Sequence, residues 1–425
     1  MNTAAARILN RYGVSPEQID PLIYADKIAE DMRKGLSHDN GNMAMIPTYL
    51  SNDGVLPYGK PAAVIDAGGT NFRRALVTFT EEECLITDYD KFRMPGIEKP
   101  TSWDEFITFT ADKVEPLMDR TDCIGFCFSY EADITPEMDG KVVIIDKEVK
   151  ISDAKGKLVG KCLSEELARR GYPGKKVVIL NDTVAVLLGG SADLDKSSYS
   201  GFIGQVSGTG TNTCCIVPGN EIGKIDVSSP SGMIVNMESG SFLGLPHGII
   251  DSRLDAGTDN PGIKLLEKKT AGVYLGGLVR LLENAAFEEK LISVETHEKF
   301  KMLGSFDASY VDAWSEGKML DELTDNEIEK QMLSDFSQAV VKRSATVMSA
   351  ILLGITKYTN TGDTPEKPAC DCAEGSLVQK CSLYRETLVN LLKSFEKTAG
   401  KYIELKVVND STIRGSAAAA LLNVR

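Results

Sequence analysis

Short apolar segments that end in polar, glycine-containing turns recur along this chain and predict β-strands. The segments are four to seven residues long and rich in Val, Ile and Phe, which is typical of buried strands. The expected strands are residues 62–66, 73–79, 123–128, 142–145, 177–180, 201–206, 213–217 and 402–408.

Apolar residues at helical spacing fill most of the remaining chain. Ser15 followed by Pro16 predicts the start of the first helix, because Pro fits the first helical position. The expected helices are residues 16–36, 158–170, 184–188, 383–395 and 416–422, and helices dominate residues 262–357. Strands that alternate with helices predict an α/β protein.

The size and charge of the chain narrow the range of its partners. Its 425 residues are enough for two or three domains of about 150 residues each. The net charge of −14 argues against nucleic acid or an acidic membrane as the main partner, since both attract basic surfaces. No run of about 18 uninterrupted apolar residues occurs, so we expect no membrane span.

The cysteines and the N-terminus predict a cytoplasmic protein. The first residues lack the apolar core and cleavage site of a signal peptide, and the nine cysteines have no regular spacing. Cys370, Cys372 and Cys381 lie close together but have no histidine near them, so reduced thiols are favoured over a zinc site. With three histidines in the whole chain, a histidine general base is not favoured.

Two hairpin turns rich in Gly and Thr carry the candidate chemistry. Residues 67–71 lie between Asp66 and Arg73, and residues 207–212 form the second turn. Glycines let a backbone approach an anion, successive N–H groups can bind it, and a guanidinium can bind two phosphate oxygens. One such turn would be an ordinary hairpin, but two of them with Asp66 favour a clamp on a polyphosphate. The chain lacks a Walker motif and a dinucleotide-binding fingerprint.

These turns resemble those of a known family. Residues 66–73 (Asp-Ala-Gly-Gly-Thr-Asn-Phe-Arg) and 208–212 (Gly-Thr-Gly-Thr-Asn) resemble the two phosphate motifs of the hexokinase family, which includes glucokinases and belongs to the actin-like ATPase superfamily. Residues 181–185 (Asn-Asp-Thr-Val-Ala) resemble its catalytic segment, and residues 260–276 resemble a segment that carries a sugar ligand. The motifs follow the family order from about residue 27 onward, and the chain is identified as a hexokinase of the bacterial type.

The resemblance implies transfer of the γ-phosphoryl group of MgATP to the 6-hydroxyl of a hexose, with glucose expected. It implies that Asp182 is the general base and that Lys147 is a catalytic lysine, with Lys150 as the alternative. The implied sugar-binding residues are Ser129, Asn181, Asn212, Glu238 and Glu267. The residues implied to bind ATP or its phosphates are Asp66, Gly68, Gly69, Thr70, Asn71, Arg73, Gly208, Thr209, Gly210, Gly375, Ser376, Ser411 and Gly415, and Asp66 would act on Mg²⁺ through water.

Four departures from the family pattern leave alternatives open. Asp146 precedes the lysine, Ser239 replaces a Trp, Glu374 replaces an Asp, and residues 130–131 are Tyr-Glu in place of Phe-Pro. Three of these flank the expected sugar pocket, so mannose, fructose or an amino sugar remains an alternative substrate. A donor such as polyphosphate and a sugar-binding regulator without catalysis are further alternatives.

The resemblance also implies the architecture. We expect two α/β domains of the actin-like (ribonuclease H-like) ATPase fold that flank a deep cleft. The expected small domain comprises residues 60–181 plus 411–425, and the large domain comprises residues 1–59 plus 182–410. The expected partners are a hexose and MgATP, with no nucleic acid and no membrane, and a homodimer is left open.

Overall fold

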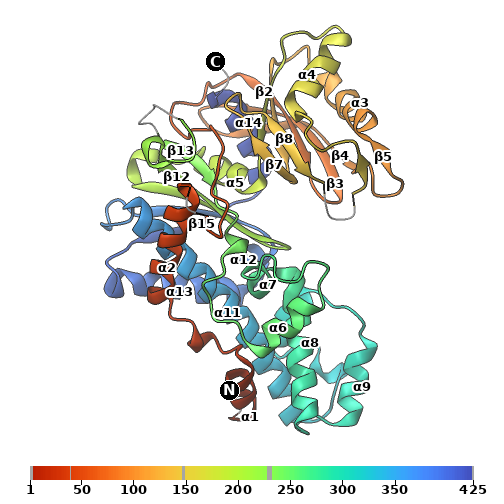
Figure 1. Cartoon of the computed structure of the whole chain (residues 1–425), viewed down its shortest axis with the longest axis vertical. Helices are drawn as coiled ribbons and strands as arrows, with labels where there is room; N and C mark the ends of the chain where they lie inside the picture. The colour runs from red at the N-terminus through yellow and green to blue at the C-terminus, as the bar shows by residue number, and fades with distance from the viewer. Residues whose placement is uncertain (1–2, 39, 146–148, 227–231, 424–425) are drawn as a thin grey trace.

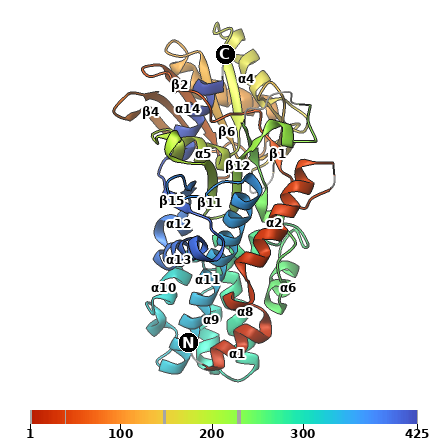
Figure 2. The ribbon, with the colours of Figure 1, turned by 90° about the vertical axis from the view of Figure 1, so that its left-hand side faces the viewer.

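The strands form two sheets at different levels of an elongated molecule (Figures 1 and 2). The computed structural model describes residues 3–38, 40–145, 149–226 and 232–423. One sheet with its helices makes up one end of the molecule, the second sheet lies in the middle, and a group of helices forms the other end, where the N-terminal helix lies (Figure 1).

The first sheet has five strands in the order β10-β6-β2-β3-β4. Its strands are β2 (Pro61–Ala67), β3 (Asn71–Phe79), β4 (Cys84–Arg93), β6 (Cys123–Phe128) and β10 (Lys176–Leu180). β2, β6 and β10 are parallel, so their carboxyl ends meet at one edge of the sheet. The hairpin of β2 and β3 confirms the glycine-containing turn expected there.

Successive residues of β2 face two different helical layers, as the alternation of side chains along a strand requires. Ala63 and Ile65 pack in the core with α3 (Trp103–Val114) and α4 (Val159–Arg169). Ala62 and Val64 pack in a second core with α5 (Asp182–Ser191) and α14 (Ser411–Asn423). Two small two-stranded sheets flank this domain: β5 (Thr101–Ser102) with β9 (Ile151–Ser152), and β7 (Glu131–Ile134) with β8 (Gly140–Ile144).

The second sheet has six strands in the order β1-β13-β12-β11-β14-β15. They are β1 (Ile46–Pro47), β11 (Gly201–Ser207), β12 (Thr211–Pro218), β13 (Gly232–Asn236), β14 (Ala369–Glu374) and β15 (Ile403–Val407). β11, β14 and β15 are parallel, and the other pairs are antiparallel. α5 packs on this sheet as well as on α14, so α5 and α14 form the layer between the two sheets.

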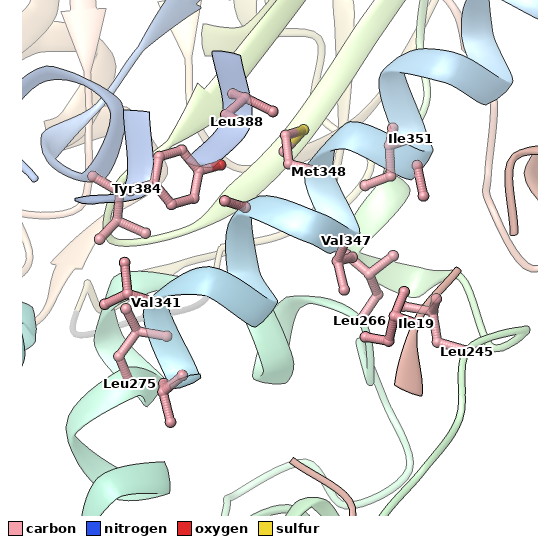
Figure 3. Packing of buried hydrophobic residues seen from close by; sticks show 14 of the residues in the cluster. Ile19, Leu245, Leu266, Leu275, Val341, Val347, Met348, Ile351, Tyr384 and Leu388 are labelled. Atoms are coloured by element: carbon pink, nitrogen blue, oxygen red, sulfur yellow. The ribbon is translucent and has the colours of Figure 1, made fainter. Parts of the chain in front are cut away.

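The helical end is built around one buried helix, α11 (Glu327–Thr359). By length and composition α11 could cross a membrane, but 94% of its most apolar window is buried inside the molecule, so it is a core helix. Figure 3 shows Val341 of α11 beside Leu275, and Val347 beside Leu266, within the same buried apolar cluster. Apart from the helices on the five-stranded sheet, the other helices of the described chain are α1 (Thr3–Tyr12), α2 (Pro21–Leu36), α6 (Ile249–Ala256), α7 (Glu267–Thr270), α8 (Gly272–Glu288), α9 (Val294–Met302), α10 (Ala308–Ser315), α12 (Ser376–Lys380) and α13 (Ser382–Thr398).

The predicted start of the first long helix is wrong. Ser15 makes no cap, and residues Pro16–Gln18 form only a short 3₁₀ turn. The long helix, α2, begins at Pro21, and its N-cap Asp20 accepts a hydrogen bond from Leu22 N–H. Pro21 explains the difference, because proline disrupts a helix interior but fits its first position. The domain boundaries expected from the sequence remain predictions.

Candidate functional site

Three parallel strands of the five-stranded sheet bring the first group of predicted site residues together. Asp66 on β2 pairs with Cys127 on β6, and Cys127 pairs with Leu180 on β10. The residues that follow these strands therefore leave the sheet at the same edge, where open α/β sheets commonly bind ligands. These residues are Gly68 to Asn71 after β2, Ser129 after β6, and Asn181 and Asp182 after β10.

Asp66 is a buried carboxylate within a group of charges. Its Oδ2 lies 3.3 Å from Nη1 of Arg73, the residue opposite it on β3. Burial raises the pKa of Asp66 to about 6, Arg73 opposes this rise, and the charges of Asp182 and Glu374 add to it. Glu374 ends β14 of the other sheet, and its carboxylate accepts a hydrogen bond from Ser411 N–H at the start of α14.

Asp182 opens α5 directly after the edge of the sheet. Asn181 is the N-cap, and its Oδ1 accepts a hydrogen bond of 2.9 Å from Thr183 N–H. The Oδ1 of Asp182 accepts from the same N–H at 2.7 Å and from Thr183 Oγ1 at 3.2 Å. The helix start thus fixes the direction of the Asp182 carboxylate, which is only half-buried. This geometry suits a carboxylate that accepts a proton from a bound alcohol.

Amide and carboxylate side chains form a second cluster on the six-stranded sheet. Asn212 Nδ2 donates to Asn236 Oδ1 at 2.9 Å and to Glu238 Oε1 at 3.2 Å. Asn236 Nδ2 also donates to Glu238 Oε1 at 2.9 Å. Glu267, the first residue of α7, accepts a hydrogen bond of 3.1 Å from Thr211 N–H, the residue before Asn212. Paired amides and carboxylates of this kind can bind adjacent hydroxyl groups.

The second Gly/Thr turn joins this cluster to the ends of β11 and β14. A Cβ on Gly210 would lie 3.0 Å from Glu267 Oε1, and a Cβ on Gly208 would lie 3.1 Å from Ser376 N. Gly375, with φ of +123°, lies against the backbone of Ser207 and Gly208. Neither Gly208 nor Gly210 has a positive φ, so these glycines are required for close approach rather than for an unusual backbone conformation.

The first turn is more open. A Cβ on Gly68 would meet only the Asn71 carbonyl oxygen, at 3.6 Å. Gly68 is held from both sides: its N–H donates to Asn71 O, and its carbonyl accepts from Tyr130 Oη at 2.7 Å. Thr70 is exposed. The same holds for Thr209 and Ser376 near the second turn, so both turns present polar side chains to solvent.

The remaining predicted residues have different surroundings. Ser411 is buried, and its hydroxyl and N–H donate to Glu374 Oε2. Gly415 lies at a helix crossing, where an added Cβ would be 1.9 Å from Ala185 O. Lys147 lies outside the described residues, and the side chain of the alternative, Lys150, is exposed. The adenosine contacts expected of Ser411 and Gly415 remain predictions, but packing alone accounts for glycine at 415.

The carboxylates of this site fit a metal ion that is already bound to the phosphates of a nucleotide. Among the described residues, no group of three or more His, Cys, Asp or Glu side chains could hold a metal ion directly. Magnesium bound to phosphates keeps several waters and uses one or two protein carboxylates. Asp66 and Glu374, two neighbouring carboxylates with pKa values raised by burial, can supply such contacts.

Sequence reasoning missed two members of these groups. Asn236 bridges Asn212 and Glu238, but an asparagine at the end of a buried strand gave no separate signal. Cys127 lies between the strand ends that carry Asp66 and Asp182, and its Sγ lies 3.9 Å from Ser129 Oγ, within hydrogen-bond distance for sulfur. The register of β6 with β2 would have indicated Cys127, because equivalent positions on parallel strands end at the same edge.

Two surface pockets lie away from the candidate site. A pocket of about 430 Å³ lies between α2 and the end of α11, and one of about 270 Å³ lies beside β10 and α4. Neither is lined by a predicted site residue. The candidate site is therefore defined by its polar groups and strand ends.

Family models and known proteins match most of this chain. Two family models, both described as hexokinase, match residues 4–192 and residues 202–422. Hexokinase-7 of Oryza sativa subsp. japonica is 27% identical over 429 residues, covering 92% of this chain and 91% of the rice protein. The chloroplastic hexokinase-2 of Nicotiana tabacum is 34% identical over 277 residues, which span 60% of this chain and 54% of the tobacco protein.

Solved structures give the same result for the fold. The structure described as hexokinase from Schistosoma mansoni complexed with glucose has a TM-score of 0.77 and 21% identity, and the match covers 98% of each chain. A second hexokinase structure has a TM-score of 0.82 and 20% identity. The α/β fold with two domains of actin-like type is thus confirmed. This chain belongs to the hexokinase family and is a hexose kinase that uses ATP as co-substrate.

Proposed function

We propose that this hexose kinase transfers the γ-phosphoryl group of MgATP to the 6-hydroxyl of its hexose, and that glucose is the preferred sugar. The observation that carries the proposal is that the Asp66–Arg73 pair and Asp182 lie where the parallel strands β2 and β10 reach one edge of the five-stranded sheet. One carboxylate there is available to the alcohol, while a buried carboxylate and a guanidinium are available to a metal-bound triphosphate.

Asp182 would act as the general base. The bond between the hexose oxygen and the γ-phosphorus forms while the bond between that phosphorus and the ADP oxygen breaks. The hydroxyl proton passes to the Asp182 carboxylate, giving hexose 6-phosphate and ADP. Asn181 and Thr183 hold the carboxylate in place through the start of α5. Mg²⁺ bound to ATP would neutralise phosphate charge, and Asp66 would bind its water.

The second cluster would bind the sugar hydroxyls. Asn212, Glu238 and Glu267 present amide and carboxylate groups beside the Gly208–Gly210 turn, and we assign the sugar to this cluster together with Ser129 and Asn181. Glucose is supported by the similar hexokinase from Schistosoma mansoni, whose structure is a complex with glucose. A regulator without catalysis is disfavoured because Asp66, Arg73 and Asp182 are all present. The cytoplasmic location and the homodimer remain predictions.

The proposal is tested by steady-state kinetics with a panel of hexoses and two phosphoryl donors. Glucose with MgATP should give the highest kcat/KM among glucose, mannose, fructose and glucosamine, and polyphosphate should not replace ATP. In Asp182→Asn, kcat should fall by about 10²- to 10⁴-fold, the usual contribution of a general base, while calorimetry still detects glucose binding. A higher kcat/KM for another sugar would refute the glucose assignment, and undiminished turnover in Asp182→Asn would refute the role of Asp182.

A further inference from the structure

The helix that begins with Glu267 is too short to hold itself in place. α7 contains only Glu267–Thr270, a single turn between a long loop and α8. One turn of helix is unstable in isolation, because ordering its backbone costs more than its hydrogen bonds return. The position of Glu267 therefore depends on the contacts that α7 makes with the rest of the molecule.

Glu267 itself lies in a confined place. A Cβ on Gly240 would be 3.0 Å from the Cβ of Glu267, and Gly210 leaves room for the Glu267 carboxylate. The carboxylate also accepts the hydrogen bond from Thr211 N–H described above. A small movement of α7 would therefore alter both the amide cluster and the Gly208–Gly210 turn.

Lys268 fixes α7 to α6 and to the preceding loop. Its Nζ lies 2.6 Å from Asp255 Oδ1 and donates to Asn260 O at 2.7 Å. Asp255 also accepts from Gly262 N–H at 2.9 Å, so one carboxylate joins α6, the loop and α7. The Lys268 side chain is 3% exposed, and that of Asp255 is 16% exposed.

Lys269 fixes α7 to the core of the helical end. Its Nζ lies 2.7 Å from Asp251 Oδ2 and 3.0 Å from His247 Nδ1. The other oxygen of Asp251 lies 3.0 Å from Nη1 of Arg343 on α11. The side chains of Lys269, Asp251 and Arg343 are all 1–3% exposed. Burial lowers the pKa of Lys269 to about 8, which reflects how completely this ammonium group is removed from water.

Apolar packing and one further hydrogen bond complete the attachment. Leu266, directly before Glu267, is fully buried, and Figure 3 shows it beside Val347 of α11 and near Ile19 and Leu245. Ser344 Oγ on α11 donates to Thr270 O at 2.7 Å. Both ends of the single turn are thus held against α11.

The buried ion pairs of Lys268 and Lys269 add little net stability to the fold. Removing charges from water costs about as much free energy as their attraction returns, so apolar residues of similar size often serve at least as well. Within the described part of the chain, Nε and Nη2 of Arg343 are buried without a hydrogen-bond partner, which adds to that cost. What the charges do supply is a defined geometry.

We infer that Lys268 and Lys269 are positioning residues, which hold Glu267 against the hexose through Asp255, Asp251 and Arg343. This inference rests on the proposed function, in which Glu267 binds the sugar. Neither lysine needs to touch a substrate for this effect. Each fixes one side of a single helical turn, so that the Glu267 carboxylate keeps its place when the sugar arrives.

The test compares four variants at a temperature where all of them are folded. Asp255→Asn removes the negative charge that pairs with Lys268 at a partly exposed site, and Asp255→Glu keeps the charge. Glu267→Gln alters the proposed sugar ligand directly. Glu283→Gln is the matched control, since Glu283 forms a buried pair of 2.9 Å with His297 elsewhere in the helical end.

The readouts are KM for glucose, KM for ATP, kcat, and the rise in melting temperature on adding glucose. Asp255→Asn should raise KM for glucose by about tenfold with a much smaller change in KM for ATP, because small displacements of a binding group are costly. Asp255→Glu should recover part of this loss. Asp255→Asn should also reduce the glucose-dependent rise in melting temperature, since stabilisation by a ligand follows its affinity. Glu283→Gln should lower the melting temperature and leave both KM values unchanged.

The outcomes separate the inference from the proposed function. If Glu267→Gln leaves KM for glucose unchanged, the sugar-binding role of Glu267 is wrong. If Glu267→Gln raises that KM while Asp255→Asn does not, the positioning role is wrong and the proposed function stands. Equal changes in the two KM values of Asp255→Asn would indicate general structural damage and would also overturn the inference.

Discussion

The amide of Asn236 joins two groups that we assign to the hexose. Its Oδ1 accepts from Asn212 Nδ2 at 2.9 Å, and its Nδ2 donates to Glu238 Oε1 at 2.9 Å. Glu238 adopts a left-handed backbone conformation with φ of +55°, which is uncommon for a residue with a side chain. Asn236 therefore sets the orientation of two neighbouring side chains, of which one is on a strained turn.

Replacing Asn236 should weaken hexose binding more than ATP binding. In Asn236→Ala, we expect KM for glucose to rise by about 30-fold, since the two partners lose hydrogen bonds of about 1 kcal/mol each. Steady-state kinetics with glucose and ATP varied in turn provide the measurement. Asn52→Ala is a control with a similarly buried amide, whose Oδ1 accepts from Ser191. A glucose KM that is equally raised in both variants would contradict the role of Asn236.

At the residue scale, the sequence was informative where side chains follow strand ends. Asp66 and Asp182 were predicted as members of one site, and the structure places them at the ends of β2 and β10, parallel strands of one sheet. Asn236 was not identified, because its role depends on the pairing of β12 with β13, which no local pattern predicts. The need for glycine at position 415 could not be predicted either, because Gly415 lies in the contact between two helices far apart in the sequence.

At the element scale, α5 and α14 determine how the two sheets are joined. A Cβ on Gly415 would be 1.9 Å from Ala185 O, and a Cβ on Gly189 would be 2.4 Å from Ser411 O. α14 also packs against the five-stranded sheet, where Gly125 of β6 lies against Ser416 O. The absence of side chains at these glycines lets a helix that begins near Glu374 lie directly on the helix that begins with Asp182.

A methyl group at Gly415 should therefore destabilise the protein. Ala is favoured over Gly by about 1 kcal/mol in a helix interior, but overpacking typically costs about 1–3 kcal/mol or more, and no side-chain movement can relieve a clash with a backbone oxygen. Gly415→Ala should unfold at a lower urea concentration than wild type. Thr412→Ala, on the same helix, should change the midpoint little. An unchanged midpoint in Gly415→Ala would show that the helix crossing is looser than described.

Elements with clear periodicity were predicted, and elements with mixed patterns were not. The strands 62–66, 123–128 and 177–180 were expected close to their observed bounds because they are continuous apolar runs. β4 was missed because an edge strand with few buried residues has little apolar signal. β14 was missed because a fully buried acid, Asp371, interrupts its apolar pattern between Cys370 and Cys372.

At the scale of the whole molecule, Asp371 should make stability depend on pH. Both carboxylate oxygens are buried without a hydrogen-bond partner among the described residues. Burial raises the pKa of Asp371 well above its ordinary value of 3.8. The folded protein therefore keeps this proton above pH 4, whereas the unfolded chain releases it. Unfolding is then coupled to proton release, and the free energy of unfolding falls as pH rises from about 4 to the folded-state pKa.

Asp371→Asn removes this dependence. The difference in unfolding free energy between Asp371→Asn and wild type should be small near pH 4 and should grow in favour of the variant by about 1.4 kcal/mol per pH unit above it. Urea denaturation at a series of pH values measures this difference, in which other titrating groups cancel. Asp122→Asn is a control in which the unfolding free energy should depend on pH in the opposite direction, because a hydrogen bond from Lys175 lowers the pKa of the exposed Asp122. A difference independent of pH would show that Asp371 is ionised in the folded protein.

The central claim is that Asp182 and the two Gly/Thr turns form one site across both sheets. A crystal structure of the chain with glucose and a non-hydrolysable ATP analogue tests it most directly. We predict that an Asp182 carboxylate oxygen lies within about 3 Å of the 6-hydroxyl oxygen, with the γ-phosphate between residues 68–71 and 208–210. Glucose bound away from Asp182, or a triphosphate that contacts neither turn, would contradict the account.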